Sequence, residues 1–413
     1  MGKKIFCPVR GVGTQPVSLK VLVVTPWFPN KPADRFGNFV FRSVEATVKA
    51  GVTVSVLVTR PWTPRIFGLL HPDWVRPPLR EDLFDPALNI RVIHYLSIPR
   101  YIFSGVADHL YARGTAATMR NLIDEQGIEL VHAHTEGAGY AAVAVARKCN
   151  VPAVVTLHGI NTAPRLLNNA AKRQRLRNTL NGADRVVLVG EPLRAYFAPL
   201  AGRDDNFRVV PNGFFLPGGD WDRDSAPWGE VLRFVSLANL HEGKGIDLNL
   251  QALARLQQAG IRNWTYSIVG GGAEQARLEA MVDTFALRDK VRFHGRVSHD
   301  RALQLLADAD VFVLPSYREA FGVAYLEAMG LGLLTVGVSG QGPEAFIAHG
   351  RTGLLVRPND ADSLYQAMTS VFENGQDVQR IAAAGKRFVH SEFTWARHAE
   401  KLIAVYREAL DGR

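Results

Sequence analysis

The segment DVFVLPSYREAFGVAYLEAMGLG, residues 310–332, joins a short apolar run to a helical pattern through a turn that contains glutamate and glycine. Similar pairs of a β-branched run and a helical pattern recur along almost the whole chain, as at KVLVVT (20–25) and LLTVGV (333–338). Strands that are apolar throughout and alternate with helices are typical of parallel sheets whose two faces are both covered. The segment and its repeats therefore predict an α/β fold.

The length of 413 residues is too great for a single hydrophobic core. Two series of strand–helix pairs, each about as long as a Rossmann-like domain, predict two facing doubly wound domains with ligands at the carboxyl ends of their strands. A stretch dense in Pro, Gly and Asp, PNGFFLPGGDWDRDSAPWGEV, predicts the linker between them. We expect a flexible N-terminal arm at 1–19, a first domain at 20–210, a linker at 211–231, a second domain at 232–392 and a C-terminal helix at 393–413.

Composition narrows the class of protein. No run approaches the roughly 18 apolar residues of a membrane span, and the N-terminal residues lack the apolar core of a secretory signal. Cys7 and Cys149 provide neither a disulfide framework nor a zinc spacing. We therefore expect a cytoplasmic protein with a hydrophobic content (47%) that is ordinary for globular domains.

Two carboxylates, Glu319 and Glu327, lie eight positions apart around the start of the expected helix at 320–330. Unpaired amides in the first turn of a helix are a natural seat for anionic oxygens. The spacing suits a ligand with hydroxyl groups at both ends and a charged group between them, such as a sugar–diphosphate–ribose. The alternative from the residues alone is two solvated glutamates, one of them favoured near a helix start by the helix dipole.

Lys244 lies in a glycine-containing turn, SLANLHEGKGIDL (236–248), that again joins a strand to a helix. A lysine beside helix amides is able to bind a diphosphate, although a single lysine in such a turn is more often an ordinary surface residue.

Taken together, the second half shows an ordered set of segments: VVPNGF (209–214), ANLHEGKG (238–245), IVGGGAEQARLE (268–279), FHGRVSHD (293–300), ADVFVLPSYREAFGVAYLEAMGLG (309–332), GPEAF (342–346) and GRTGLLVRPND (350–360). This set resembles glycosyltransferase family 4. The first half resembles that family more loosely, through residues 23–51 and VVTLHG (154–159), and residues 393–410 resemble its closing helix. The resemblance implies a GT-B fold, in which the last helix crosses back onto the first domain.

The resemblance also implies a role for each matching residue. Glu319, with the amides of Ala320, Phe321 and Gly322, would hold the hydroxyls of the donor sugar. Glu327 would hold the ribose hydroxyls, and Lys244 the diphosphate.

In the first domain, Gly37 and Asn38 would approach the diphosphate or the acceptor. His158 would face the donor sugar across the cleft, and its alternative reading is a structural histidine at a strand end. The residues expected to be catalytic are thus His158, Glu319 and Lys244. Asn239, which we count among the donor-binding residues, stands where the family usually has arginine, so one expected cation is missing.

Metal binding is not expected. Pairs of aspartates at 220/222, 308/310 and 360/362 are of a kind that binds divalent ions in other sugar transferases, but they fall in a linker, a turn and a helix cap. His132 and His134 share one face of a strand without an evident third ligand. We expect no cofactor, with a nucleotide sugar as co-substrate.

Positive charge is concentrated in the first half. Residues 1–205 contain 26 Lys and Arg against 15 Asp and Glu, or +11, whereas the remainder contains 22 against 24, or −2. No nucleic-acid-binding signature accompanies this charge. Basic residues beside aromatic ones favour contact with anionic lipid, against the simpler reading of a solvated helix and a packed loop. The expected membrane-contact residues are Arg165, Lys172, Arg173, Arg175, Arg177, Trp62, Phe67 and Trp74.

Together with the resemblance, which implies retention at the anomeric carbon, these observations predict a glycosyltransferase that moves a hexose from a GDP- or UDP-linked donor to a glycan acceptor. We expect this acceptor to be lipid-linked and to belong to bacterial cell-surface polysaccharide biosynthesis. The place of the enzyme would be peripheral, at the inner face of the cell membrane. A sugar-nucleotide epimerase or phosphorylase of the same architecture is the alternative, and a two-lobed sugar-binding protein is a more remote one. The base, the sugar, the acceptor and the oligomeric state are not legible in the sequence.

Overall fold

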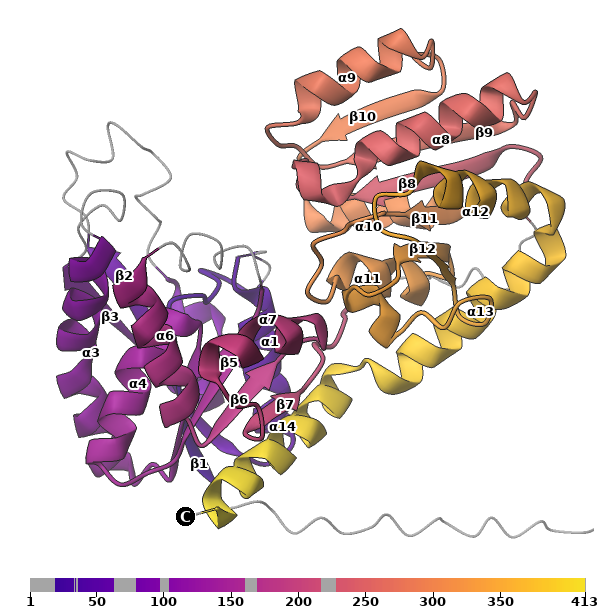
Figure 1. Ribbon diagram of the computed structural model, residues 1–413. Coiled ribbons are helices and arrows are strands. Elements are labelled where there is room, and N and C mark those ends of the chain that lie inside the picture. Colours follow the sequence, from indigo (N-terminus) through magenta and orange to yellow (C-terminus); the bar gives the residue numbers. More distant parts are fainter. Residues whose placement is uncertain are drawn as a thin grey trace, which may run out of the picture.

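Two parallel sheets, each flanked by helices, make up the chain in this computed structural model (Figure 1). The structure describes residues 19–32, 34, 36–62, 79–96, 104–159, 169–216 and 228–412, with 104–108 by their backbone alone. All strand pairs within the two sheets are parallel, so the predicted α/β fold with two doubly wound domains is confirmed.

The first sheet has the strand order β3-β2-β1-β4-β5-β6-β7, which reverses direction between β1 and β4. Its strands are β1 (Lys20–Thr25), β2 (Thr53–Trp62), β3 (Ile90–Leu96), β4 (Leu130–His134), β5 (Ala153–Leu157), β6 (Arg185–Leu188) and β7 (Phe207–Val209).

Alternate residues of these strands enter two separate cores. Leu22 and Val24 of β1 belong to a core that includes residues of the helices between β3 and β6, whereas Val21 and Val23 pack with residues of the helix after β1 and of the last helix, α14 (Trp395–Asp411). Both faces of the sheet are thus covered, which explains why its strands are apolar throughout. The helices of this domain are α1 (Asn38–Lys49), α3 (Ser104–Gln126), α4 (Glu136–Lys148), α6 (Ala170–Gly182) and α7 (Pro192–Ala201), with short 3₁₀ turns η2 (Glu81–Leu83) and η3 (Pro86–Leu88).

The second sheet has the strand order β10-β9-β8-β11-β12-β13, with its reversal between β8 and β11. Its strands are β8 (Leu232–Leu237), β9 (Trp264–Val269), β10 (Val291–Gly295), β11 (Val311–Val313), β12 (Leu334–Val338) and β13 (Leu354–Val356). Its helices are α8 (Ile246–Gln258), α9 (Gln275–Thr284), α10 (His299–Ala307), α11 (Val323–Gly330), α12 (Ala361–Glu373) and α13 (Gly375–Glu392), with η4 (Glu242–Lys244) and η5 (Gly342–Ala345).

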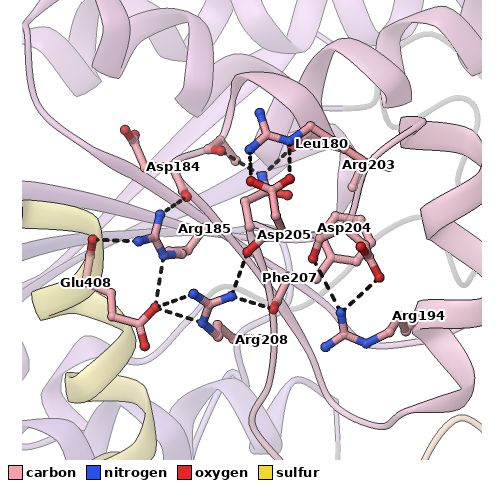
Figure 2. A network of polar contacts seen from close by, with 12 residues as sticks. Leu180, Asp184, Arg185, Arg194, Arg203, Asp204, Asp205, Phe207, Arg208 and Glu408 are labelled. Atoms are coloured by element: carbon pink, nitrogen blue, oxygen red, sulfur yellow. Dashed lines mark hydrogen bonds and ion pairs between the residues drawn. The ribbon is translucent and has the colours of Figure 1, made fainter. Parts of the chain in front are cut away.

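The last two helices connect the domains. Figure 1 shows α13 leaving the second domain and α14 (Trp395–Asp411) running back along the first, where it contacts α1, β5 and β6. Glu408 of α14 accepts hydrogen bonds from Arg185 Nε at 3.1 Å and Arg208 Nε at 2.8 Å (Figure 2). Since Arg185 and Arg208 lie on β6 and β7, this pairing ties the end of the chain to the edge of the first sheet.

No helix in the described part of the chain combines the length and the apolar character that crossing a membrane requires.

Candidate active site

The carboxyl ends of β8 and β11 lie side by side, because these strands pair in parallel where the strand order reverses. The chain after β8 passes Asn239 and enters η4, and the chain after β11 passes Glu319 on its way to α11. Ser316 Oγ and Tyr317 N both donate to the carbonyl oxygen of Gly243, each at 3.1 Å. These bonds hold the two loops together at the edge where open α/β sheets bind ligands.

Lys244 and Glu319 meet at this edge. Their Nζ and Oε2 atoms are 2.6 Å apart, and the side chains are only 15% and 14% exposed. Gly245 permits this approach, because a Cβ on it would lie 2.5 Å from the carbonyl oxygen of Pro315. A partly buried charge needs a counter-charge, and each of the two supplies it for the other. The site therefore offers a cation and a carboxylate to one ligand.

The prediction of a helix at 320–330 is wrong at its start, since α11 begins at Val323. Gly322 has a φ of 94°, a left-handed conformation that a right-handed helix cannot contain. The amides of Ala320, Phe321 and Gly322 thus lie in the turn before the helix, and no described group accepts a hydrogen bond from them. These amides are therefore still able to donate to anionic oxygens, but from a turn and not from the first turn of a helix.

Glu327 lies in the second turn of α11 and is 11% exposed. Its Oε1 atom is 2.8 Å from Nε2 of His299, the first residue of α10. No sequence signal pointed to this contact, because the two residues belong to different helices. The structure therefore adds His299 to the surroundings of the second carboxylate.

His158 lies in the first domain, directly after β5, and bonds to a second histidine. Its Nε2 atom is 2.8 Å from Nδ1 of His134, at the end of the neighbouring strand β4. The rings of Phe39 and Trp27 lie 4.5 and 6.1 Å from the His158 ring. His158 Nδ1 is buried and has no hydrogen-bond partner among the described residues.

Burial keeps this group of histidines neutral. It lowers the pKa of His134 to about 3, with His398 adding a smaller effect, and it lowers the pKa of His158 well below its usual range. His132 bonds to Tyr406 and Thr156 at 2.7 Å each, so the two strand histidines have interior partners. The sequence analysis did not predict the pairing of His134 with His158, although both residues lie at the ends of strands that the sequence predicts.

Gly37 and Asn38 lie where the loop between β1 and α1 ends. A Cβ on Gly37, which has a φ of 72°, would lie 2.6 Å from the backbone nitrogen of Phe28, so glycine is needed for close packing of the loop on the end of β1. Asn38 Nδ2 donates to the carbonyl oxygens of Pro32 and Asp34, both at 3.1 Å. In this structure the Asn38 amide nitrogen therefore holds the loop itself.

The two domains touch at Gly190, which follows β6. A Cβ on Gly190 would lie 2.0 Å from the carbonyl oxygen of Ala320. The turn between the two carboxylates thus lies against the first domain.

Asn239 is exposed after β8, where the family pattern has a cation. Arg318 lies nearby: its Cβ would be 3.5 Å from a Cβ on Gly243, and its guanidinium lies 5.9 Å from the centre of the Tyr317 ring. Arg318 is exposed and forms no ion pair with a described residue. It is a cation on the same pair of loops.

Among the expected membrane-contact residues, Arg165, Phe67 and Trp74 lie outside the described residues. Trp62, at the end of β2, is 53% exposed. On α6, Arg173 and Arg177 are exposed one turn apart, and Lys172 is half-buried.

Arg175, which was also expected to contact the membrane, is not positioned to do so. Its Nε and Nη2 atoms are buried, because position 175 shares the inward face of α6 with Leu176 and Thr179.

The aspartate pairs have structural roles where the structure describes them. Asp310 is buried and accepts from Arg233 Nε and Nη2 at 3.0 Å each. Asp360 caps α12 by accepting from Ser363 N at 2.8 Å. The pair at 220/222 lies outside the described residues, and within them no three His, Cys, Asp or Glu side chains gather as metal ligands would.

Comparison with known proteins gives matches over both domains. The family model described as "Glycosyltransferase Family 4" matches residues 36–215, and the one described as "Glycosyl transferases group 1" matches residues 220–388.

Curated relatives and solved structures agree with these models. A glycogen synthase of Mycobacterium tuberculosis is 29% identical over 69% of this chain and 70% of its own. A GDP-mannose-dependent alpha-(1-6)-phosphatidylinositol monomannoside mannosyltransferase of Mycolicibacterium smegmatis is 27% identical over 72% of this chain and 80% of its own. Among solved structures, a sucrose-phosphate synthase from Thermosynechococcus elongatus superposes with a TM-score of 0.72 at 22% identity, covering 96% of this chain and all of the other.

Proposed function

Because the chain belongs to glycosyltransferase family 4, we propose that it transfers a hexose from a nucleoside diphosphate sugar to a hydroxyl group of a glycan, with retention of configuration at the anomeric carbon. The arrangement of Glu319, the turn 320–322 and Glu327 is the observation that carries this proposal. Two carboxylates suit the hydroxyls of a sugar and of a ribose, and the turn amides with Lys244 suit the diphosphate between them.

In the proposed reaction the bond from the anomeric carbon to the phosphate oxygen breaks, and a bond to the acceptor oxygen forms on the same face. The proton of the acceptor hydroxyl goes to the departing phosphate. Negative charge grows on that phosphate, so Lys244 and the amides of the turn stabilise the transition state more than the ground state. On donor binding, Lys244 exchanges part of its contact with Glu319 for the diphosphate, and Glu319 accepts from the sugar hydroxyls. The proposal requires no metal ion or other cofactor.

For the substrates, we propose a GDP- or UDP-linked donor and a lipid-linked glycan acceptor in the assembly of a bacterial cell-surface polysaccharide. The name of the Mycolicibacterium relative, which specifies GDP-mannose and a phosphatidylinositol monomannoside, supports a nucleotide sugar and a lipid-borne acceptor.

A thermal-shift panel of nucleotide sugars tests the donor, since one base and one sugar should stabilise the protein selectively. Glu327→Ala should weaken nucleoside diphosphate binding by about 10- to 100-fold, because a hydrogen bond to a charged group contributes about 1.5–3 kcal/mol. Glu319→Ala should chiefly reduce transfer. Glu373→Ala, which changes an exposed acid at the end of α12, is the control. Full transfer activity in both Glu327→Ala and Glu319→Ala would refute the proposed roles of these two carboxylates and the function based on them.

Product analysis separates the alternatives. Incubation of the donor alone would reveal an epimerase, added phosphate would reveal a phosphorylase, and turnover that requires a glycan acceptor identifies a transferase. Binding without any turnover would favour a two-lobed sugar-binding protein.

We further propose that the first domain contacts an anionic membrane from the cytoplasmic side. Arg173 and Arg177 on α6 and the exposed Trp62 support this, together with the charge of +11 on residues 1–205. Flotation with vesicles containing anionic lipid should decrease when Lys172, Arg173 and Arg177 are changed to Gln. A variant with the same loss of charge in the second domain, at Arg255, Arg288 and Arg380, is the control. Flotation that is independent of anionic lipid would end this part of the proposal.

A further inference from the structure

Glu327 is a carboxylate with little access to water. Its side chain is 11% exposed, and the surrounding α11 residues Leu326, Ala328 and Met329 are fully buried. An ionised carboxylate in such a place needs a partner, because burial of an unpaired charge is costly. Within the described chain that partner is His299 Nε2, 2.8 Å from Oε1.

The carboxylate is only half engaged by this bond. No described residue donates to its second oxygen, Oε2, and that atom is not among the buried polar atoms that lack a partner. Glu327 thus has one oxygen held by the protein and one that retains access from outside. A carboxylate with one oxygen held and the other accessible is able to accept a hydrogen bond from a ligand hydroxyl in a defined orientation.

His299 is held in place independently of α11. It opens α10, whose N-terminus is capped by the Ser298 hydroxyl accepting from Arg301 N. The loop that precedes it is anchored to the neighbouring strand end, since Gly270 N donates to the carbonyl oxygen of Gly295 at 2.8 Å. These bonds fix the backbone that carries His299, and its Nε2 atom is the donor to the ionised carboxylate of Glu327.

We propose that His299 is a positioning residue for recognition of the donor ribose. The His299 imidazole holds Oε1 of Glu327. The Glu327 side chain is therefore already ordered before the donor binds, and its Oε2 accepts from the ribose hydroxyls. This inference rests on the proposed function and adds a residue, His299, to its site. The final torsion of a glutamate is broad and roughly two-fold, so a hydrogen bond that selects one orientation reduces the entropy lost on binding.

The test compares two ligands across three variants. Titration calorimetry measures binding of the preferred nucleoside diphosphate, chosen from UDP, GDP, ADP, CDP and TDP, and of its 2′,3′-dideoxy analogue. The variants are His299→Leu, which removes the donor, His299→Gln, whose amide nitrogen is able to donate at a similar reach, and the control Arg301→Leu on the exposed side of the same helical turn. Thermal midpoints establish that each variant is folded.

We expect His299→Leu to bind the nucleoside diphosphate about tenfold more weakly and the dideoxy analogue unchanged. His299→Gln should recover affinity to within about threefold of the wild type, and Arg301→Leu should match it. In transfer assays the donor KM of His299→Leu should rise about tenfold with kcat unchanged, which is the pattern of lost uniform binding.

Three results overturn the inference. Equal losses for the two ligands would make His299 a structural residue, and unchanged affinity in His299→Leu would remove its role. A wild-type protein that binds the two ligands equally would refute the ribose role of Glu327, while diphosphate binding and the proposed function stand. If the wild type binds none of the five nucleoside diphosphates, the proposed function itself fails, and the inference with it.

Discussion

Gly190→Ala should reduce the rate of sugar transfer while the protein remains folded. A Cβ at position 190 would lie 2.0 Å from the carbonyl oxygen of Ala320, whereas real contacts of this kind are almost never below 3.0 Å. Either the first domain or the turn 320–322 must therefore move by about 1 Å. A misplacement of about 1 Å at a site that works by positioning can reduce the rate about 100-fold.

The assay is kcat/KM for sugar transfer, with the thermal midpoint and the circular dichroism spectrum as folding controls. Gly137→Ala is the matched variant, because a Cβ there meets nothing within 4 Å and lies near the start of α4. We expect Gly190→Ala to lose about 100-fold in kcat/KM and Gly137→Ala to lose nothing. Nucleoside diphosphate affinity then locates the movement: it stays constant if the domains separate and decreases if the turn 320–322 shifts. Transfer by Gly190→Ala within threefold of the wild type would refute this reasoning about the domain contact.

Three further predictions concern charge. Asn239→Arg should raise nucleoside diphosphate affinity about tenfold in calorimetry by supplying the cation that the family pattern has there; unchanged affinity would mean that the site has no place for it. The stability of the protein should decrease below about pH 6.5, because burial lowers the pKa of His134 to about 3 and of His398 to about 4, whereas unfolding releases both to ordinary values. Each neutral histidine then contributes stability that is complete above pH 6.5 and is lost by about 1 kcal/mol at pH 5.5, which urea unfolding at pH 7.5 and 5.5 measures. Glu408→Gln should lower the free energy of unfolding by about 0.5–1 kcal/mol in the same assay, since its pairs with Arg185 and Arg208 are partly exposed; a loss above about 3 kcal/mol would show that this estimate is too low.

The fold was predictable because its signals are local. Continuously buried strands such as β12 (Leu334–Val338) alternate with helices, and this pattern is the direct consequence of a sheet covered on both faces. Glu319, Glu327 and Lys244 were singled out from the sequence, since each lies near a strand end or a helix start in a recognisable segment. The structure brings Glu319 and Lys244 together, and the binding roles of all three residues stay predictions. The start of α11 was not predicted, because residues distant in sequence pack against the turn before it. A Cβ on Gly342 would lie 2.4 Å from Phe321 N, and one on Gly190 would lie 2.0 Å from the carbonyl oxygen of Ala320.

The sequence by itself determined the two-domain architecture and which polar groups lie at the strand ends of the candidate site, because strand ends and glycine turns are encoded by neighbouring residues. Only the tertiary structure decided which groups pair. The contacts of His299 with Glu327, of His134 with His158 and of Gly190 with Ala320 join different elements, and in the last case different domains. Such contacts depend on how helices and sheets pack in three dimensions, for which no single segment of the chain carries a signal.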